Sequence, residues 1–409
     1  MNLFSERLEA FPRITPYRQA KAAQLWPYYK TVETAATPKF TIEGREVINF
    51  GSNNYLSLSY HPDVIAAAQA ATAHYGTGVT GSRLLNGTLP LHRELEEELA
   101  DFYGREASLV FPTGYVANLC GISGYLDRHD FAIVDREAHN SLVTAIRLSG
   151  ARLKRFRHND VDHLASILAQ LPPGPAKGVI VDGVYSMRGD TSPIPEILDL
   201  VEQTPNAFLF DDEAHGLGVL GAQGRGAAEH YGVLDRADII TVTFSKTLGS
   251  CGGAVIGSSD AIELLTITSE AFIFTASNVP ASMAAALASL RILRADPERP
   301  QRLRANMAHL IAALTERGVR TNPVESAIVT IPLKQNDDVS TVYTFRDLFE
   351  LGVFVNPVIP PASHGNAGLL RLSLMVDHTP DLLEEAADVV LKVLTDGDQL
   401  VESDDDSTD

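Results

Sequence analysis

Short, continuous apolar runs alternate with helical segments through the central part of this 409-residue chain. The runs lie at residues 107–111, 131–135, 178–186, 207–212, 237–244 and 252–257. A parallel strand covered by helices on both faces reads as such an uninterrupted run, because neither face meets water. The pattern therefore predicts an α/β fold with a mostly parallel sheet between helices. Ligands bind such sheets at the edge where the strands end.

The texture of the sequence predicts four segments. Residues 1–59 read as a helix, an extended arm and a hairpin, and we expect them to form an N-terminal arm and part of a smaller domain. Residues 60–289 form the predicted large domain. Residues 290–396, with weaker strands near 326–333 and 369–374, form a smaller α+β domain. Residues 397–409 are rich in acids and are predicted to be a disordered tail.

Composition limits the class of function. The net charge of −19 argues against binding nucleic acid, whose phosphates require a basic face. Two cysteines, Cys120 and Cys251, cannot build a disulfide framework or a four-thiolate metal site, so we expect no metal and a reducing, cytoplasmic setting. The first residues lack the apolar core of a signal peptide. No run approaches the roughly 18 apolar residues of a membrane span, so none is predicted.

Reactive side chains follow several of the predicted strands. Asp212 ends one apolar run and His215 follows it, while Lys246 comes directly after the next run. An amine near a carboxylate and an imidazole fits pyridoxal phosphate (PLP), which binds a lysine as a Schiff base and needs a carboxylate at its ring nitrogen. His139, after the run at 131–135, is a candidate for stacking on the ring.

The remaining part of such a site would hold the phosphate. The Gly114–Tyr115 turn opens a probable helix, and a helix start with free N–H groups binds anions. Thr243 and Ser245 flank Lys246 and add hydroxyl donors. Taken singly, each feature has an ordinary reading: a solvated lysine, an acidic helix start, a structural histidine, a turn. Their joint occurrence, in order and at strand ends, favours a PLP site.

Several stretches that surround these residues carry a family resemblance. They are INFGSNNYLSL, GTGVTGSRLLNGTLPLHRELEEELADFYG, FPTGYVANL, DREAHNSL, RFRHNDV, GVYSMRGD, DDEAHGLGVLGAQGRG, TFSKTLGSCGG, FIFTAS and LLRLSLMVDHTP. Together they resemble the α-oxoamine synthase family of fold-type I PLP enzymes, and closely its serine palmitoyltransferase branch, over about residues 45–395. The resemblance implies fold type I, PLP, a homodimer with active sites at its interface, and decarboxylative condensation of an amino acid with an acyl thioester.

The resemblance also implies a role for individual residues. Lys246 would hold PLP, Asp212 would pair with the pyridinium nitrogen, His139 would stack on the ring, and His215 with Ser186 would bond the phenolic oxygen. Gly114, Tyr115, Thr243 and Ser245 would surround the phosphate, with Thr275 reaching across from the partner subunit. Arg371 would bind the substrate carboxylate, and Asn54 would lie near it.

The motif SRLLNGT favours serine palmitoyltransferase activity: L-serine and a long-chain acyl-CoA would give a 3-keto long-chain base, the first step of sphingolipid synthesis. Asp182 departs from this branch, in which glutamate is more usual. The alternative is a related synthase that condenses alanine or glycine with another acyl-CoA or a carrier-protein thioester, like 7-keto-8-aminopelargonate synthases or amino-ketone synthases of secondary metabolism. The acidic chain favours acyl-CoA over an acidic acyl carrier protein. A third possibility, a PLP-binding subunit without catalysis, conflicts with retention of Lys246, Asp212 and His139.

Overall fold

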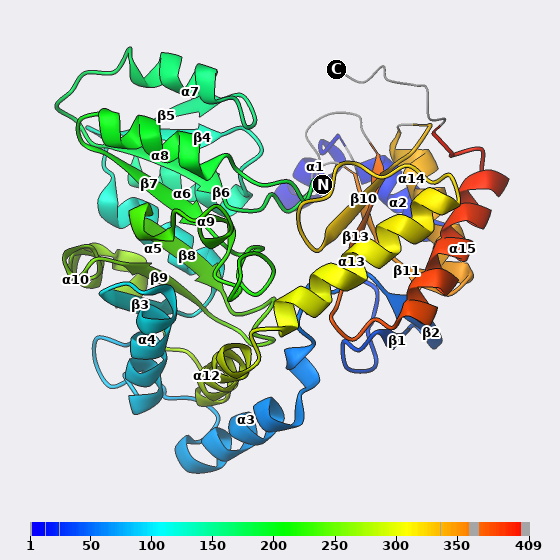
Figure 1. Cartoon of the computed structure of the whole chain (residues 1–409), viewed down its shortest axis with the longest axis horizontal. Helices are drawn as coiled ribbons and strands as arrows, with labels where there is room; N and C mark the ends of the chain where they lie inside the picture. The colour runs from blue at the N-terminus through cyan, green and yellow to red at the C-terminus, as the bar shows by residue number, and fades with distance from the viewer. Residues whose placement is uncertain (1, 13, 24, 336, 360–367, 402–409) are drawn as a thin grey trace.

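The computed structural model describes residues 2–12, 14–23, 25–335, 337–359 and 368–401 and is built around one large sheet and two small ones (Figure 1). The large sheet has the strand order β3-β9-β8-β7-β6-β4-β5. Its strands are β3 (Ala107–Phe111), β4 (Phe131–Asp135), β5 (Arg152–Phe156), β6 (Lys177–Asp182), β7 (Ala207–Asp212), β8 (Ile239–Thr243) and β9 (Gly253–Gly257). Strands β4 to β8 are parallel, and β9 is antiparallel to β3 and β8. The predicted mostly parallel α/β sheet is confirmed.

Both faces of this sheet are buried, as the continuous apolar runs predict. Within β6, Val179 and Val181 belong to one apolar core and Ile180 to another on the opposite face. The only strand of the large sheet that the run pattern missed is β5, whose charged sequence RLKRF is exposed except at Phe156. The helices and short helical turns of this region are α4 (Pro90–Tyr103), α5 (Gly114–Tyr125), α6 (Asn140–Ser149), α7 (Val161–Leu168), α8 (Ile194–Gln203), α9 (Ala227–His230), η2 (Leu234–Arg236), α10 (Ser259–Thr268) and α11 (Glu270–Ile273).

The two small sheets combine the ends of the chain. The hairpin of β1 (Lys39–Ile42) and β2 (Arg45–Asn49) pairs through β2 with β11 (Val353–Phe354), far along the sequence. The other sheet has the order β10-β13-β12, formed by β10 (Ile328–Pro332), β13 (Leu369–Ser373) and β12 (Asn356–Val358). Figure 1 shows both beside α13 (Arg299–Glu316), α14 (Asp338–Glu350) and α15 (Pro380–Asp396), to the right of the large sheet.

The remaining helices belong to the first 75 residues of the chain, except for one at residues 280–295. They are α1 (Leu3–Glu9), α2 (Ile14–Ala22), η1 (Leu58–Tyr60), α3 (Pro62–Tyr75) and α12 (Pro280–Ala295). The predicted boundary at residue 290 falls inside α12, which packs on α3 and α4. Within the described part of the chain, none of the helices is both long and apolar enough to cross a membrane.

The C-terminal segment is packed beyond the predicted start of the tail at residue 397. Gln399 is buried, and its main-chain carbonyl accepts a hydrogen bond from the Lys334 N–H. Its side-chain oxygen accepts another from the Gln335 N–H at 3.1 Å. The segment up to residue 401 therefore belongs to the folded structure, whereas residues 402–409 of the predicted tail lie outside the described residues.

Candidate active site

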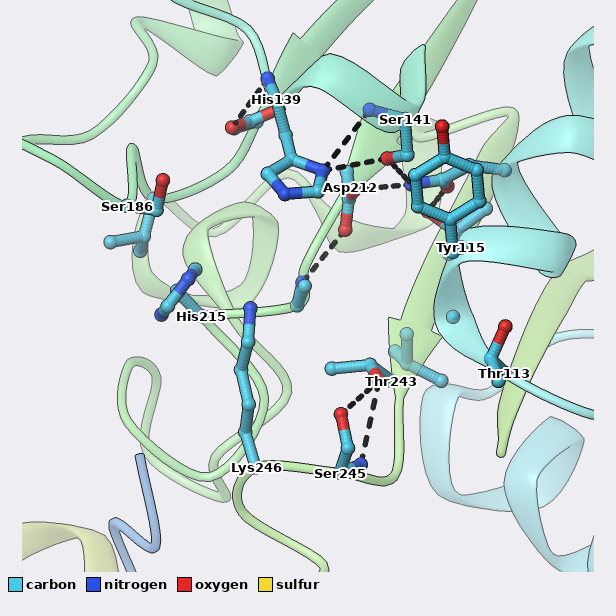
Figure 2. Close-up of a pocket in the computed structure, with 17 residues that line it drawn as sticks. Thr113, Tyr115, His139, Ser141, Ser186, Asp212, His215, Thr243, Ser245 and Lys246 are labelled. Carbon is cyan, nitrogen blue, oxygen red and sulfur yellow. Dashed lines mark hydrogen bonds between the residues drawn. The ribbon is translucent and has the colours of Figure 1, made fainter. Parts of the chain in front are cut away.

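The carboxyl ends of β6, β7 and β8, together with the start of α5, line a cavity of about 230 Å³ (Figure 2). Parallel strands end at one edge of the sheet, so their terminal side chains and loops meet there. Most of the residues singled out from the sequence line this cavity: Gly114, Tyr115, His139, Ser186, Asp212, His215, Thr243, Ser245 and Lys246. Asn54, Thr275 and Arg371 are not among the lining residues.

Lys246 places an amine inside the cavity. Figure 2 shows its side chain directed toward the space between Asp212, His139 and His215. Burial lowers the pKa of Lys246 from 10.5 to about 8, and the nearby Asp212 carboxylate opposes this only in part. A burial-lowered pKa makes the neutral, nucleophilic amine accessible near neutral pH.

The Asp212 carboxylate is held by two donors. The Asn118 amide donates to one oxygen at 2.7 Å, and the Ala214 N–H donates to the other at 2.9 Å. Asn118 is fixed in turn by Ser141 and Thr241, at 2.9 Å each. Sequence reasoning missed Asn118, although it lies in the GYVAN stretch, one helical turn after Gly114, on the same face of α5.

His139 and His215 lie on different sides of the Lys246 amine, as Figure 2 shows. The His139 main-chain N–H donates to the carboxylate of Asp182, which also lines the cavity, at 3.2 Å. The ring nitrogen Nδ1 of His139 lies 2.7 Å from the Ser141 hydroxyl. Burial raises the pKa of Asp182 well above its ordinary value, and the negative charge of Asp212 adds to this effect. Asp182 therefore bonds the His139 backbone and also lies close enough to Asp212 for the two negative charges to repel each other.

His215 is buried and bonded to a residue that sequence reasoning missed. Its Nδ1 lies 2.7 Å from the hydroxyl of Tyr55, which is fully buried. Burial lowers the pKa of His215 well below its ordinary value, and the charges of Lys246 and Arg371 act in the same direction. His215 is therefore a neutral imidazole at physiological pH. Nothing local in the sequence could reveal Tyr55, because it comes from a loop far from the strand ends.

The start of α5, together with the end of β8 and the residues after it, forms a wall whose donors suit an anion, and we call it the anion-binding wall. The Thr113 side chain caps the helix by accepting from the Val116 N–H, and the first-turn N–H groups of α5 lack helical acceptors. The hydroxyls of Thr243 and Ser245 lie 2.9 Å apart on the facing loop. A Cβ at Gly114 would lie 2.6 Å from the Thr243 Cβ, so only glycine allows the helix start this close to β8.

Arg371 lies just behind the cavity wall. Its Nε donates to the Ser186 carbonyl at 2.5 Å, and its Nη2 donates to the Asn53 side chain at 3.2 Å. Asn53 also accepts from the hydroxyls of Tyr55 and Ser373. The structure thus brings Asn53 against Arg371, whereas Asn54 faces away: its amide donates to the Ala36 carbonyl and its oxygen accepts from the Ser59 N–H.

Thr275 is half-buried and does not reach this cavity in a single chain. Its predicted contact comes from a partner subunit, so one chain does not test it, and it stays a prediction. No group of three or more His, Cys, Asp or Glu side chains in the described ranges is arranged to hold a metal ion.

The donor set fits PLP. It offers a reactive amine, a carboxylate held by neutral donors, two imidazoles, and hydroxyls beside a helix start, in one cavity. A fold of this kind with a lysine and an aspartate at adjacent strand ends defines the fold-type I class. The family model of class I and II aminotransferases matches residues 45–390, and this chain belongs to that family.

Within the family, the chain is similar to serine palmitoyltransferases along nearly its whole length. It is 39% identical to the serine palmitoyltransferase of Sphingobacterium spiritivorum over 95% of this chain and 96% of that protein. It is 41% identical to that of Caulobacter vibrioides over 86% and 85%. A high-resolution serine palmitoyltransferase structure described with a PLP internal aldimine superposes with a TM-score of 0.92 at 34% identity, covering 97% of this chain and all of the other. The resemblance predicted from the motifs is confirmed.

A second group of synthases is also related. A putative 8-amino-7-oxononanoate synthase of Mycobacterium tuberculosis is 40% identical over 84% of this chain but only 44% of its own length. An 8-amino-7-oxononanoate synthase structure from Francisella tularensis superposes with a TM-score of 0.73 at 25% identity, over 85% of this chain and 98% of that one.

Proposed function

We propose that this protein is a PLP-dependent acyltransferase that condenses L-serine with a long-chain acyl-CoA, with loss of CO₂, to give a 3-keto long-chain base. One observation carries the proposal: the buried amine of Lys246 shares a cavity with Asp212, His139 and His215, in a chain that is 39% identical to a serine palmitoyltransferase over 95% of its length. The product would enter sphingolipid synthesis.

In this proposal each wall of the cavity holds one part of the cofactor. Lys246 would carry it, Asp212 would face the pyridine nitrogen, and His139 would lie on the ring. Its phenolic oxygen would meet His215 and Ser186, and its phosphate would meet the wall built from Gly114, Tyr115, Thr243 and Ser245. PLP, when bound, supplies an electron sink that stabilises negative charge on the substrate α-carbon.

The chain's own residues would then bind the substrate and move the proton. Lys246, once released by the incoming amino acid, would take the α-proton on Nζ, and a pKa of about 8 suits a base that works near neutral pH. Arg371 would bind the substrate carboxylate with its planar guanidinium group. The Ser186 carbonyl and the Asn53 side chain orient that group.

We further propose that the protein is a homodimer with shared active sites. Leu84, Leu85 and Phe274 are large apolar side chains that are 61%, 80% and 83% exposed in the single chain. They lie in the GSRLLNG and FIFTAS stretches, next to the predicted partner-reaching Thr275. Exposed apolar groups gathered in this way mark an interface. The two free cysteines, Cys120 and Cys251, are compatible with the predicted reducing cytoplasm.

The second candidate is condensation of alanine or glycine with another thioester. The relation to 8-amino-7-oxononanoate synthases favours it, because that group shares the fold and much of the sequence. The two candidates differ in the amino acid that binds beside Arg371 and in the acyl donor.

A spectral titration followed by an acyl-donor series tests the proposal. We expect a yellow protein whose spectrum changes most with L-serine, and turnover with long-chain acyl-CoA that is lost, by at least about a thousandfold, in Lys246→Ala, because that variant lacks both the base and the attachment point. Lys154→Ala, on the exposed edge strand β5, is the control and should retain wild-type turnover. A protein that stays colourless with added PLP would refute the enzyme; a larger response to alanine or glycine would select the second candidate.

A further inference from the structure

The side chain of His158 lies between two carboxylates, one at the end of strand β4 and the other in the loop after strand β6. Its Nδ1 is 3.1 Å from Asp135 Oδ1, and its Nε2 is 2.8 Å from Asp190 Oδ2. His158 belongs to the RFRHNDV stretch, which carries the family resemblance but has no part in the proposed chemistry. Its ring also packs edge-on against Tyr185, with ring centroids 4.5 Å apart.

Each of the two carboxylates belongs to a segment that also carries part of the site. Asp135 ends β4, and its carboxylate accepts the Glu137 N–H at 2.7 Å at the beginning of the turn that leads to His139. Asp190 lies in residues 183–193, between β6 and α8, which we call the Ser186 loop. The carbonyl of Ser186 holds the Nε of Arg371. His158 thus joins the end of the strand that leads to His139 to the loop that orients Arg371.

The neighbouring residue reinforces the same connection. The Asn159 N–H donates to Asp135 Oδ2 at 2.9 Å, and the Asn159 amide donates to the Thr191 carbonyl at 2.9 Å. The same part of the Ser186 loop, residues 189–191, is also held from the other side by residues that precede β10: the Ser326 hydroxyl donates to the Gly189 carbonyl, and Glu325 accepts the Thr191 N–H, both at 2.8 Å. Residues 189–191 are therefore held from both sides, three residues after Ser186.

We propose that His158 is a positioning residue for amino-acid binding: its imidazolium bridges Asp135 and Asp190, fixes the Ser186 loop, and thereby sets the position of Arg371 for the substrate carboxylate. This inference rests on the proposed function. It assigns no contact between His158 and substrate or cofactor, because the residue acts through the Ser186 carbonyl.

The chemistry of the bridge requires the charged ring. A carboxylate only accepts hydrogen bonds, so both ring nitrogens must carry hydrogen to bond Asp135 and Asp190 together. Burial lowers the pKa of His158, but the hydrogen bonds to these two carboxylates outweigh it and raise the pKa to about 9. The ring therefore stays charged through the physiological range and loses the second donor above about pH 9.

The other ionisable groups around the ring are few and identifiable. Tyr185 packs on it from the Ser186 loop, and burial raises the pKa of this tyrosine well above its ordinary value. Glu137 and Arg188 pair across the two loops at 3.9 Å, and Arg157 pairs with Asp160 at 2.6 Å within the segment of His158 itself. Both arginines are more than half exposed, so these pairs contribute weakly.

The test is a KM measurement for the amino acid in His158→Gln and Asp190→Asn. We expect KM to rise about tenfold in each, the size set by a lost charge-assisted hydrogen bond, with a smaller change in kcat. The double variant should be no worse than the single ones, because both break the same bridge. His309→Gln, which removes a histidine–glutamate pair between α13 and α15, is the matched control and should leave KM unchanged.

The pH dependence separates positioning from general destabilisation. The ratio of the His158→Gln KM to the wild-type KM should be about ten at pH 7.5 and fall toward one above pH 9, where the wild-type ring has lost its second donor. A ratio that stays constant across this range, a KM that does not change, or additive effects in the double variant would overturn the proposal.

A second measurement is independent of the reaction. Nitrogen-15 NMR of histidine-labelled protein, with His158 assigned by its absence in His158→Gln, should show both ring nitrogens protonated at pH 7.5. A singly protonated ring would disprove the bridge even if catalysis proceeds as proposed. If instead the protein responds to an amino acid other than serine, the proposed substrate fails, the KM series is run with that amino acid, and the NMR result still decides on the bridge.

Discussion

At the scale of single residues, Asn53 and Asn54 are adjacent amides whose side chains bond to different parts of the molecule. Asn53 bonds Arg371, Tyr55 and Ser373, all at the rear of the cavity. Asn54, which the sequence predicted to lie near the substrate carboxylate, instead bonds the Ala36 carbonyl and the Ser59 N–H with its side chain. Asn53 therefore orients a side chain beside the cavity, whereas Asn54 joins two backbone segments of the fold.

This difference predicts opposite results for two alanine variants. Asn53→Ala should raise the KM for the amino acid several-fold with little loss of stability, because Arg371 loses one of its two orienting partners. Asn54→Ala should lower the free energy of unfolding by about 1 kcal/mol, since it leaves two partly buried backbone groups without their side-chain partner, with an unchanged KM. Steady-state kinetics and thermal unfolding of both variants decide the matter, and a raised KM in Asn54→Ala alone would restore the original assignment.

The residues that the sequence could identify are those at strand ends. Lys246, Asp212, His215 and His139 each follow an apolar run, so their position at the edge of the sheet could be inferred from the run alone. Tyr55, Asn53 and His158 reach the site or its supports from loops whose course depends on tertiary packing. No local pattern records that course, and these residues could not be predicted.

At the scale of elements, the end of β7 presents acids to both faces of the sheet. Asp212 faces the cavity, while the alternation of a strand turns Asp211 to the opposite side, where Glu213 also lies; both are completely buried. Three glycines pack closely against the Glu213 carboxyl group. A Cβ would lie 2.6 Å from it at Gly183, 1.7 Å at Gly216 and 2.2 Å at Gly226, so a side chain at any of these positions would clash with it. Burial, and then mutual repulsion, raises the pKa of Asp211 well above its ordinary value. Burial raises that of Glu213 to about 7.

These acids predict a stability that falls as the pH rises. The folded protein keeps a proton on Glu213 that the unfolded chain, with a glutamate pKa of 4.5, has already lost. Between about pH 4.5 and 7 the folded state therefore binds more protons, and the free energy of unfolding decreases with pH. Asp211→Asn removes an acid whose ionisation burial opposes, a cost that grows as the pH rises, so its melting temperature should exceed that of the wild type by several degrees at pH 8 and by less at pH 5.

Thermal unfolding at the two pH values measures this effect. Glu97→Gln, an exposed acid on α4, is the control and should shift the melting temperature equally at both. An Asp211→Asn advantage that is the same at pH 5 and pH 8, or larger at pH 5, would show that folding does not raise the pKa of Asp211. The element pattern was predictable except where strands are exposed or short: β5 is charged, and β11 has only two residues.

At the scale of the whole molecule, Leu84, Leu85 and Phe274 are the exposed apolar residues that the proposed partner subunit would cover. Leu85 and Phe274 are the most exposed of these, and both lie near the predicted partner-reaching Thr275. Burial of each large apolar side chain contributes about 1.5–3 kcal/mol to association. A charge at either position would instead have to be desolvated in the interface.

Charge introduction at this surface should therefore separate the subunits. Leu85→Glu with Phe274→Glu is expected to give a monomer by light scattering at micromolar concentration, with activity reduced at least tenfold, because the site would lose its partner-derived residues. Leu148→Glu, a similarly exposed position at the end of α6, should remain dimeric and active. A wild-type chain that is itself monomeric, or a dimer that survives both charges, would refute the proposed interface.

The order of strands in the large sheet also governs how a newly made chain can assemble. The edge strand β3 pairs with β9, in which Gly253 is the partner of Phe111. Five other strands of the sheet are synthesised between these two, so β3 stays unpaired until β9 has been made. Until then the apolar side chains of β3 and the start of α5 lack the strands they pack against, and long-range closure of this kind is slow and prone to aggregation. The anion-binding wall joins the start of α5, which follows β3, to the end of β8, and β9 lies between β3 and β8 in the sheet, so we expect this wall to form only after β9 has been synthesised.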